Sequence, residues 1–311
     1  MVTMTELSQL ILKDYQTRKR KKQKDQFIDL LQSHFPQLQV QQSRFMGNRN
    51  LILGDLKTAS VIFAAHYDTC AQMPIPNFIA PKSILLSSLY SLLLVIPALL
   101  ITLALDILIG LLISNFWVNY VANLVILAGL LVLMLAGKAN NHTANDNTSG
   151  VITVLEIYQA LTDEQRRKAA FVLFDNEEIG LIGSTLFRKQ YKAETENTLL
   201  VNFDCVSDGD HILLALSKDA QKHQEAIAKA FTPTESKLIL IENAEKIFYP
   251  SDQMGFPVSV AVASLHHKKG IGYYMSRIHT KKDVIFDEAN ITLLTNAAIT
   301  LIPNIAESAP E

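Results

Sequence analysis

The stretch SVIFAAHYDT (residues 60–69) decides the fold class. Its first half is apolar and rich in β-branched residues, which predicts a buried strand that stops at His66. Two later runs repeat this arrangement: AAFVLF (169–174) is followed by DNEE (175–178), and TLLVNF (198–203) is followed by Asp204. Polar residues suited to metal binding therefore begin where three buried strands end.

Helical patterns alternate with these strands. We expect helices over 6–34 (one or two), 149–161, 184–191, 220–230 and 287–302, and further strands over 37–41, 50–54, 212–216, 238–242 and 258–263. Strands that alternate with helices predict an α/β fold, here a three-layer sandwich with a mostly parallel central sheet. A chain of 311 residues can bury one large core of this kind.

The composition excludes several classes of function. The 28 Lys and Arg residues nearly balance the 30 Asp and Glu residues, so the net charge of −2 gives no reason to expect a nucleic-acid partner. The two cysteines, Cys70 and Cys205, form neither a disulfide framework nor a thiolate metal site by spacing, and we interpret both as small buried residues. The polar N-terminal residues lack the apolar region of a signal peptide.

Residues Ile84–Ala136 form a long apolar segment in which Asp106 is the only charged residue. A membrane-spanning helix needs about 20 apolar residues, so two spans fit, over about 84–105 and 117–136, with a turn around 106–115. Pro97 would kink the first span. We expect a transmembrane hairpin at 83–137, inserted between the parts 1–82 and 138–311 of one α/β domain; the alternative is a buried helical hairpin in a soluble fold.

Basic residues indicate how this hairpin would lie. Lys82 and Lys138 flank its open end, whereas the turn carries no Lys or Arg. The positive-inside tendency then predicts a two-span protein of the cell membrane, with both termini and the α/β domain on the cytoplasmic side. Both cysteines would remain reduced there. We interpret the upstream run RKRKK (18–22) as a solvated helix face.

The polar residues after the three strands are expected to meet, because ligands of open α/β sheets lie beyond the carboxyl ends of the strands. Two more segments supply similar residues: NDNTSG (145–150) and RIHTKKD (277–283). Taken singly, Glu177-Glu178 reads as a solvated acidic pair, Asp204 as a turn cap and His279 as a loop residue. Together the segments offer two imidazoles and several carboxylates, a set that suits zinc.

These motifs resemble the co-catalytic zinc aminopeptidase family that includes bacterial leucyl aminopeptidases and glutamate carboxypeptidase. The matching stretches, in the family's order, are AHYDT (65–69), NDNTSG (145–150), FDNEEIGLIGS (174–184), NFDCV (202–206) and RIHTKKD (277–283). SDQMGF (251–256) resembles the family segment that precedes the last ligand. The resemblance extends from about residue 25 to residue 302.

The resemblance implies a role for each matched residue. Two zinc ions per chain would be held by five side chains, with His66 and Asp204 on one ion, Glu178 and His279 on the other, and Asp146 bridging both. Glu177 would be the general base and Asp68 would orient His66. The resemblance also implies a cis peptide after the bridging acid, at Asp146-Asn147.

The implied activity is hydrolysis of peptide substrates by a membrane-anchored, zinc-dependent exopeptidase, favoured here as an aminopeptidase. A water shared by the two ions would attack the scissile bond, and Glu177 would move its proton to the leaving amine. The alternatives are a single-zinc acyltransferase similar to glutaminyl cyclase and a non-catalytic, receptor-like relative. Retention of both His66 and Asp146 disfavours the first, and the complete ligand set disfavours the second.

The sequence departs from the family in one respect. About 80 residues separate His66 from Asp146, and most of them belong to the apolar segment. We therefore expect the catalytic opening to lie near the bilayer and to favour membrane-proximal or apolar peptides. Candidates for the pocket that chooses the substrate terminus are Tyr249, Tyr273, Tyr274 and Arg277, whereas His266-His267 is interpreted as a solvated loop.

Overall fold

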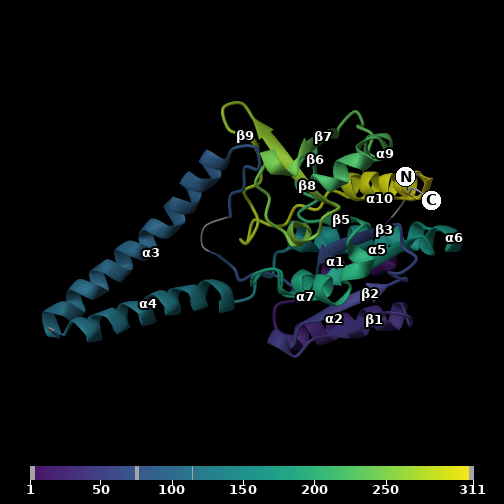
Figure 1. The fold of residues 1–311 in the computed structure, drawn as a ribbon. Helices are drawn as coiled ribbons and strands as arrows, with labels where there is room; N and C mark the ends of the chain where they lie inside the picture. The colour runs from purple at the N-terminus through teal and green to yellow at the C-terminus, as the bar shows by residue number, and fades with distance from the viewer. Residues whose placement is uncertain (1–3, 74–76, 114, 308–311) are drawn as a thin grey trace.

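The computed structural model describes residues 4–73, 77–113 and 115–307. A nine-stranded sheet forms its centre, in the order β1-β2-β4-β3-β5-β8-β6-β7, with β9 paired to β8 (Figure 1). The strands are β1 (Gln39–Gln42), β2 (Arg49–Leu53), β3 (Val61–His66), β4 (Ala169–Phe174), β5 (Leu199–Phe203), β6 (His211–Leu216), β7 (Leu238–Asn243), β8 (Ser259–Lys268) and β9 (Gly272–Tyr274).

The sheet is mixed, so the expectation of a mostly parallel sheet was wrong. Strands β4, β3, β5 and β8 are parallel to one another, but β6 is antiparallel to β8, and β1 and β2 are antiparallel to their neighbours. The link between β5 and β6, residues 204–210, explains this difference. It is too short for the crossover of a dozen or more residues that parallel strands require, so β6 runs in the opposite direction.

Helices cover both faces of the sheet. They are α1 (Glu6–Asp14), α2 (Lys21–His34), α5 (Gly150–Ala160), α6 (Asp163–Arg166), α7 (Ile182–Gln190), α8 (Lys192–Thr195), α9 (Gln224–Ala230) and α10 (Glu288–Glu307). Strand β3 shows why two apolar layers form: Val61, Phe63 and Ala65 pack in the core with α1, α2, α5 and α10, whereas Ile62 and Ala64 pack in the core with Phe187 of α7. Alternate side chains of a strand point to opposite faces.

The apolar segment forms two antiparallel helices, α3 (Ile84–Leu112) and α4 (Phe116–Ala136), which project from the sheet domain (Figure 1). The predicted turn around 106–115 was placed too early: α3 continues through Asp106, whose Oδ1 accepts a hydrogen bond from Asn123 of α4 at 2.6 Å. Among the described residues α3 is the one helix long and apolar enough to cross a membrane, whereas 116–129 of α4 is a shorter apolar helix. The expectation of two membrane spans is therefore not supported for the second one, at 117–136. Most described side chains of both helices are exposed, unlike those of a buried hairpin.

Candidate metal centre

The polar residues that follow β3, β4 and β5 lie together at the carboxyl ends of these strands. His66 ends β3, Glu177 and Glu178 follow β4, and Asp204 follows β5. Two loops complete the group: 144–149, an irregular helical turn before α5, brings Asp146, and the loop after β9 brings His279. Because parallel strands deliver their ends to one edge, residues more than 200 positions apart meet there.

The two oxygens of Asp146 face different histidines. Oδ1 lies 3.4 Å from Nε2 of His66, and Oδ2 lies 3.0 Å from Nε2 of His279. Each histidine also faces a second carboxylate: Asp204 Oδ1 lies 3.6 Å from His66, and Glu178 Oε2 lies 3.4 Å from His279. The five side chains thus form two half-sites that share Asp146.

The half-sites fit metal ions. Zinc binds nitrogen and oxygen at about 2.0–2.2 Å, so neighbouring ligands of a tetrahedral ion lie about 3.3 Å apart, close to the separations found here. Oδ1 of Asp204 and Oε1 of Glu178 are buried and accept no hydrogen bond within the described part of the chain. Buried carboxylate oxygens need a proton, a donor or a cation, and a divalent ion between them and the imidazoles would satisfy them.

The electrostatics point the same way. Burial, reinforced by Asp146, raises the pKa of Glu178 to about 8. Burial alone would lower the pKa of His279, but Glu178 and Asp146 raise it to about 9. The cluster therefore binds positive charge strongly, as protons when no metal is bound, and a dication would displace those protons.

The carboxylate of Asp68, which was expected to orient His66, makes its hydrogen bonds to other groups. Its carboxylate accepts the backbone N–H groups of Glu177 at 3.0 Å and Glu178 at 3.3 Å. The His66 ring instead makes its 3.1 Å hydrogen bond through Nδ1 to the backbone carbonyl of Asp68, while the carboxylate lies 3.6 Å away. Because Nδ1 of His66 bonds to the Asp68 carbonyl, Nε2 of the ring is free to face Asp146 and Asp204. The Asp68 carboxylate instead holds the backbone of the Glu177-Glu178 turn.

Three residues without a role in the sequence-based interpretation fix the loop that carries Asp146. Asn147 Oδ1 accepts from the N–H groups of Gly150 (3.0 Å) and Cys205 (3.2 Å), and its Nδ2 donates to the Phe203 carbonyl at 2.9 Å. Asn145 Oδ1 accepts the N–H groups of residues 207 and 208, and the carboxylate of Asp283 accepts those of residues 145 and 146. The expected cis peptide at Asp146-Asn147 is present.

Arg18 supports the site from the N-terminal segment. It is completely buried, so the interpretation of 18–22 as a solvated face was wrong for this residue. Its backbone N–H donates to Thr69 Oγ1 at 3.0 Å, and its guanidinium donates to the Tyr67 carbonyl at 2.5 Å and to Thr148 Oγ1 at 3.2 Å. Burial lowers the Arg18 pKa to about 10. Arg18 therefore joins the loop after His66 to the loop of Asp146.

A cavity of about 280 Å³ opens over the two half-sites. It is lined by His66, Asn77, Ile79, Asp146, Glu177, Glu178, Gly180, Leu181, Asp204, Cys205, Tyr249, Pro250, Ile278 and His279. Glu177 thus faces the same space as the candidate ligands, and burial raises its pKa well above the usual range. Asn77 and Ile79 belong to the segment that leads into α3, so the hairpin connection forms part of the cavity wall.

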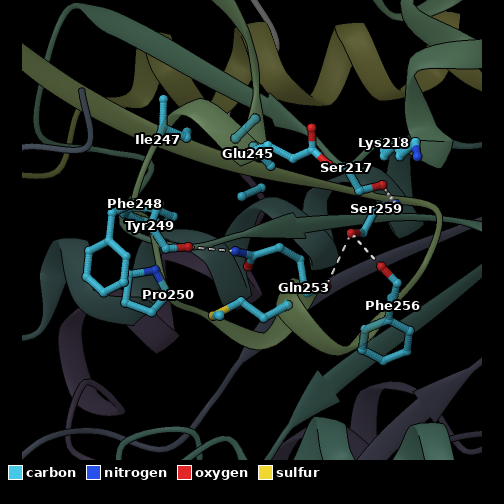
Figure 2. A pocket seen from close by; sticks show the side chains of 14 residues that line it. Ser217, Lys218, Glu245, Ile247, Phe248, Tyr249, Pro250, Gln253, Phe256 and Ser259 are labelled. Atoms are coloured by element: carbon cyan, nitrogen blue, oxygen red, sulfur yellow. Dashed lines mark hydrogen bonds between the residues drawn. The ribbon is translucent and has the colours of Figure 1, made fainter. Parts of the chain in front are cut away.

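A second cavity, of about 270 Å³, adjoins the first and shares Tyr249 and Pro250 with it (Figure 2). Phe248, Met254 and Phe256 are among the apolar side chains that line it. The hydroxyl of Tyr249 donates to the Asp204 carbonyl at 3.0 Å, which fixes the ring between the cavities.

The other proposed pocket residues lie elsewhere. Tyr273 and Tyr274 are on β9 and line neither cavity. Arg277 donates to both carboxylate oxygens of Asp208 at 2.7 Å. His266 lies on β8 with Nε2 2.9 Å from Asp208, so its assignment to a solvated loop was wrong.

Comparison with models of protein families gave a match. The model of peptidase family M28 matches residues 132–302, which include all the candidate site residues except His66 and Asp68. The comparison with curated proteins gave no match.

Solved structures show the same fold. The LapA aminopeptidase of Legionella pneumophila is similar with a TM-score of 0.55 at 13% identity, over 98% of this chain and 69% of that one. LapB of the same organism is similar with a TM-score of 0.55 at 13% identity, over 96% of this chain and 70% of LapB. PhTET1-12s, a dodecamer in its crystal, is similar with a TM-score of 0.50 at 12% identity, over 96% of this chain and 99% of that one. The family match covers more than half of this chain, and the chain therefore belongs to peptidase family M28 and is a metallopeptidase.

Proposed function

We propose that this metallopeptidase is a membrane-anchored zinc exopeptidase of the aminopeptidase type that uses two zinc ions per chain. The observation that carries the proposal is the position of Asp146, whose two oxygens face His66 and His279 separately. One carboxylate can bridge two ions about 3.5–4 Å apart in this way. His66 and Asp204 would hold one ion, and Glu178 and His279 the other.

Bound zinc would supply Lewis-acid polarisation of the scissile carbonyl and a lowered pKa for water in the cavity. Glu177 would act as the general base, because it lines this cavity and is not required by either half-site. It would take a proton from the attacking water and deliver it to the leaving amine. Asp68 would keep Glu177 in place through the N–H group of that residue.

The second cavity supports binding of an apolar side chain of the substrate. It adjoins the cavity over the two half-sites at Tyr249-Pro250. Its lining is largely apolar, although it includes polar residues such as Lys218 and Glu245. Replacing Ala244, which also lines it, with Phe should reduce kcat/KM for peptides with a large apolar residue about 10–200-fold. Peptides with alanine there should be affected less; equal losses would contradict this assignment.

Metal content and turnover test the chemistry together. The full-length protein, purified in detergent and loaded with zinc, should hold two ions per chain and cleave peptides with a free amino terminus but not amino-blocked ones. Glu177→Gln should keep both ions and lose about 10²–10⁴-fold in kcat. Glu196→Gln, an exposed change, serves as the control and should leave turnover unchanged.

Other results would replace the proposal. One ion per chain with cyclisation of amino-terminal glutamine would identify the acyltransferase alternative. Folded, metal-free protein without turnover on any peptide would favour the receptor-like one.

Membrane anchoring rests on the hairpin. Phe116, Trp117 and Tyr120 form an exposed aromatic cluster at its tip, and Tyr90 contacts Phe78, with ring centroids 5.3 Å apart, near its base. The 23 residues of α3 from Tyr90 to its end span about 33 Å, at 1.5 Å for each step from one residue to the next, close to the roughly 30 Å of a bilayer core. Aromatic residues gather at both membrane interfaces.

Labelling of introduced cysteines would test this topology. Cys70 and Cys205 are buried, so a membrane-impermeant maleimide should modify only an added exposed thiol. In intact cells Asn115→Cys at the hairpin tip should react from outside, whereas Phe45→Cys on the sheet domain should react only after lysis. The reverse pattern would refute the cytoplasmic orientation, and release of the protein by alkaline carbonate would refute anchoring.

A further inference from the structure

Cys70 lies beside one half-site and has no role in the chemistry described so far. Its Sγ, a carboxylate oxygen of Glu178 and a ring nitrogen of His279 all lie within 4.8 Å of one another. The side chain is buried, with 2% exposure, and follows the segment that carries His66 and Asp68. A sulfur atom in this position can do more than fill space.

Two further observations point to a ligand at this position. Oε1 of Glu178 accepts no hydrogen bond within the described part of the chain, although its side chain is only 8% exposed. Asn140 directs its Nδ2 toward Cys70 Sγ at 3.8 Å, and the same amide donates to the carbonyls of His142 (2.6 Å) and Thr280 (3.2 Å). A donor fixed in this way behind a potential ligand is typical of the outer shell of a metal site.

We propose that Cys70 supplies a sulfur ligand to the ion held by Glu178 and His279. The inference rests on the proposed metal centre. At near-tetrahedral angles, a Zn–S distance of about 2.3 Å places sulfur and nitrogen ligands roughly 3.6 Å apart, and zinc can take a fifth ligand when water binds. Since the three atoms lie within 4.8 Å of one another, the Cys70 sulfur has to approach the nitrogen by at most about 1.2 Å. Coordination replaces the S–H bond by an S–metal bond, and the thiol proton leaves to solvent.

This ligand makes the two half-sites chemically different. The half-site of His66 and Asp204 offers nitrogen and oxygen, whereas the half-site of Glu178 and His279 gains a soft sulfur atom. Thiolate selects zinc over manganese or magnesium, which prefer oxygen. Cys70 would thus make zinc the preferred metal at one position of the centre.

Cobalt titration of the metal-free, full-length protein tests the inference. Cobalt(II) bound to a thiolate absorbs in the near ultraviolet through sulfur-to-metal charge transfer, so the band should appear with one of the two ions. Cys70→Ser should abolish the band and weaken zinc binding at one site at least about tenfold. Cys205→Ser is the matched control, because Cys205 is equally buried but belongs to none of the metal-binding groups found among the described residues.

The outcomes separate this inference from the proposed function. Two bound ions without the charge-transfer band, or unchanged zinc affinity in Cys70→Ser, would overturn the role of Cys70 and leave the two-metal centre intact. Failure to bind cobalt or zinc in the wild type and in both variants would instead refute the metal centre itself.

Discussion

Asn147 offers the sharpest test of how the bridging carboxylate is held. Its completely buried side chain joins three backbone groups: the N–H of Gly150, the N–H of Cys205 and the carbonyl of Phe203. These groups belong to the start of α5, to the end of β5 and to the residues just after β5, which include Asp204. Asn147→Ala removes all three hydrogen bonds without touching a candidate ligand.

The expected loss of stability follows from these three contacts. A buried backbone group left without a partner costs about 1–3 kcal/mol, so three such groups amount to about 3–9 kcal/mol. Domains of this kind unfold with only about 5–15 kcal/mol. Asn147→Ala should therefore lose at least about 3 kcal/mol in the free energy of unfolding of the metal-free protein, and a large part of its zinc affinity.

Urea unfolding of the metal-free protein in detergent, followed by circular dichroism, measures the effect. Asn141→Ala is the matched control, because Asn141 is exposed and, among the described residues, its side chain makes a single hydrogen bond, accepted from Thr17 at 3.4 Å. That change should cost less than about 0.5 kcal/mol. If the free energies of unfolding of the two variants differ by less than about 1 kcal/mol, the hydrogen bonds of Asn147 do not fix the loop.

Further predictions concern packing, pH and the hairpin. Gly183→Ala should lower the free energy of unfolding by about 1–3 kcal/mol or more, because an added Cβ would lie 2.2 Å from the Asp175 carbonyl oxygen. Gly255→Ala is the control: its added Cβ would have its nearest neighbour at 3.6 Å, so the same unfolding assay should show little change. Burial raises the Asp252 pKa from 3.8 to about 7, so the folded state holds this proton more tightly and the metal-free protein should lose stability as pH rises from about 4 to about 7. Asp252→Asn should remove a pH-dependent loss on the order of 4 kcal/mol, seen as a flatter dependence of the urea midpoint on pH; an unchanged slope would contradict the assignment. Ile101→Arg, in the middle of α3, should disfavour membrane insertion by about 2.5–3.5 kcal/mol, measured as the fraction of protein recovered in membranes, and full recovery would argue against a spanning helix.

The sequence predicts much of the site because its main signal is local. Each of the runs 60–66, 169–174 and 198–203 is apolar up to its last residues, and each forms a strand that ends within a residue of the predicted position. Once three such strands lie side by side in one sheet, their carboxyl ends lie at the same edge. His66 and Asp204 therefore come together although they are far apart in the sequence. The direction of β6, by contrast, depends on the length of one short link rather than on its own composition.

Long-range contacts account for what the sequence could not reveal. Arg18 stands in a run of basic residues that reads as solvated, yet its guanidinium lies between two loops that only the folded chain brings to it. The contact of Asp68 with the Glu177 N–H depends equally on how two strand ends face each other. Asp106 interrupts an apolar pattern and suggests a turn, but a partner on the facing helix, Asn123, allows α3 to continue through it.

The same reasoning explains how a site can survive the insertion of a hairpin between two of its candidate ligands. Ala71 and Ala139 form an antiparallel bridge, the Gln72 N–H donates to the Lys138 carbonyl at 2.8 Å, and the Asn140 N–H donates to the Cys70 carbonyl at 3.2 Å. The chain therefore returns to the point it left before it reaches Asp146. Closing a longer loop costs only about 0.6 kcal/mol for each doubling of its length. A paired exit and return thus allow the long excursion of α3 and α4 while His66 and Asp146 keep the 3.4 Å contact on which the proposed metal centre depends.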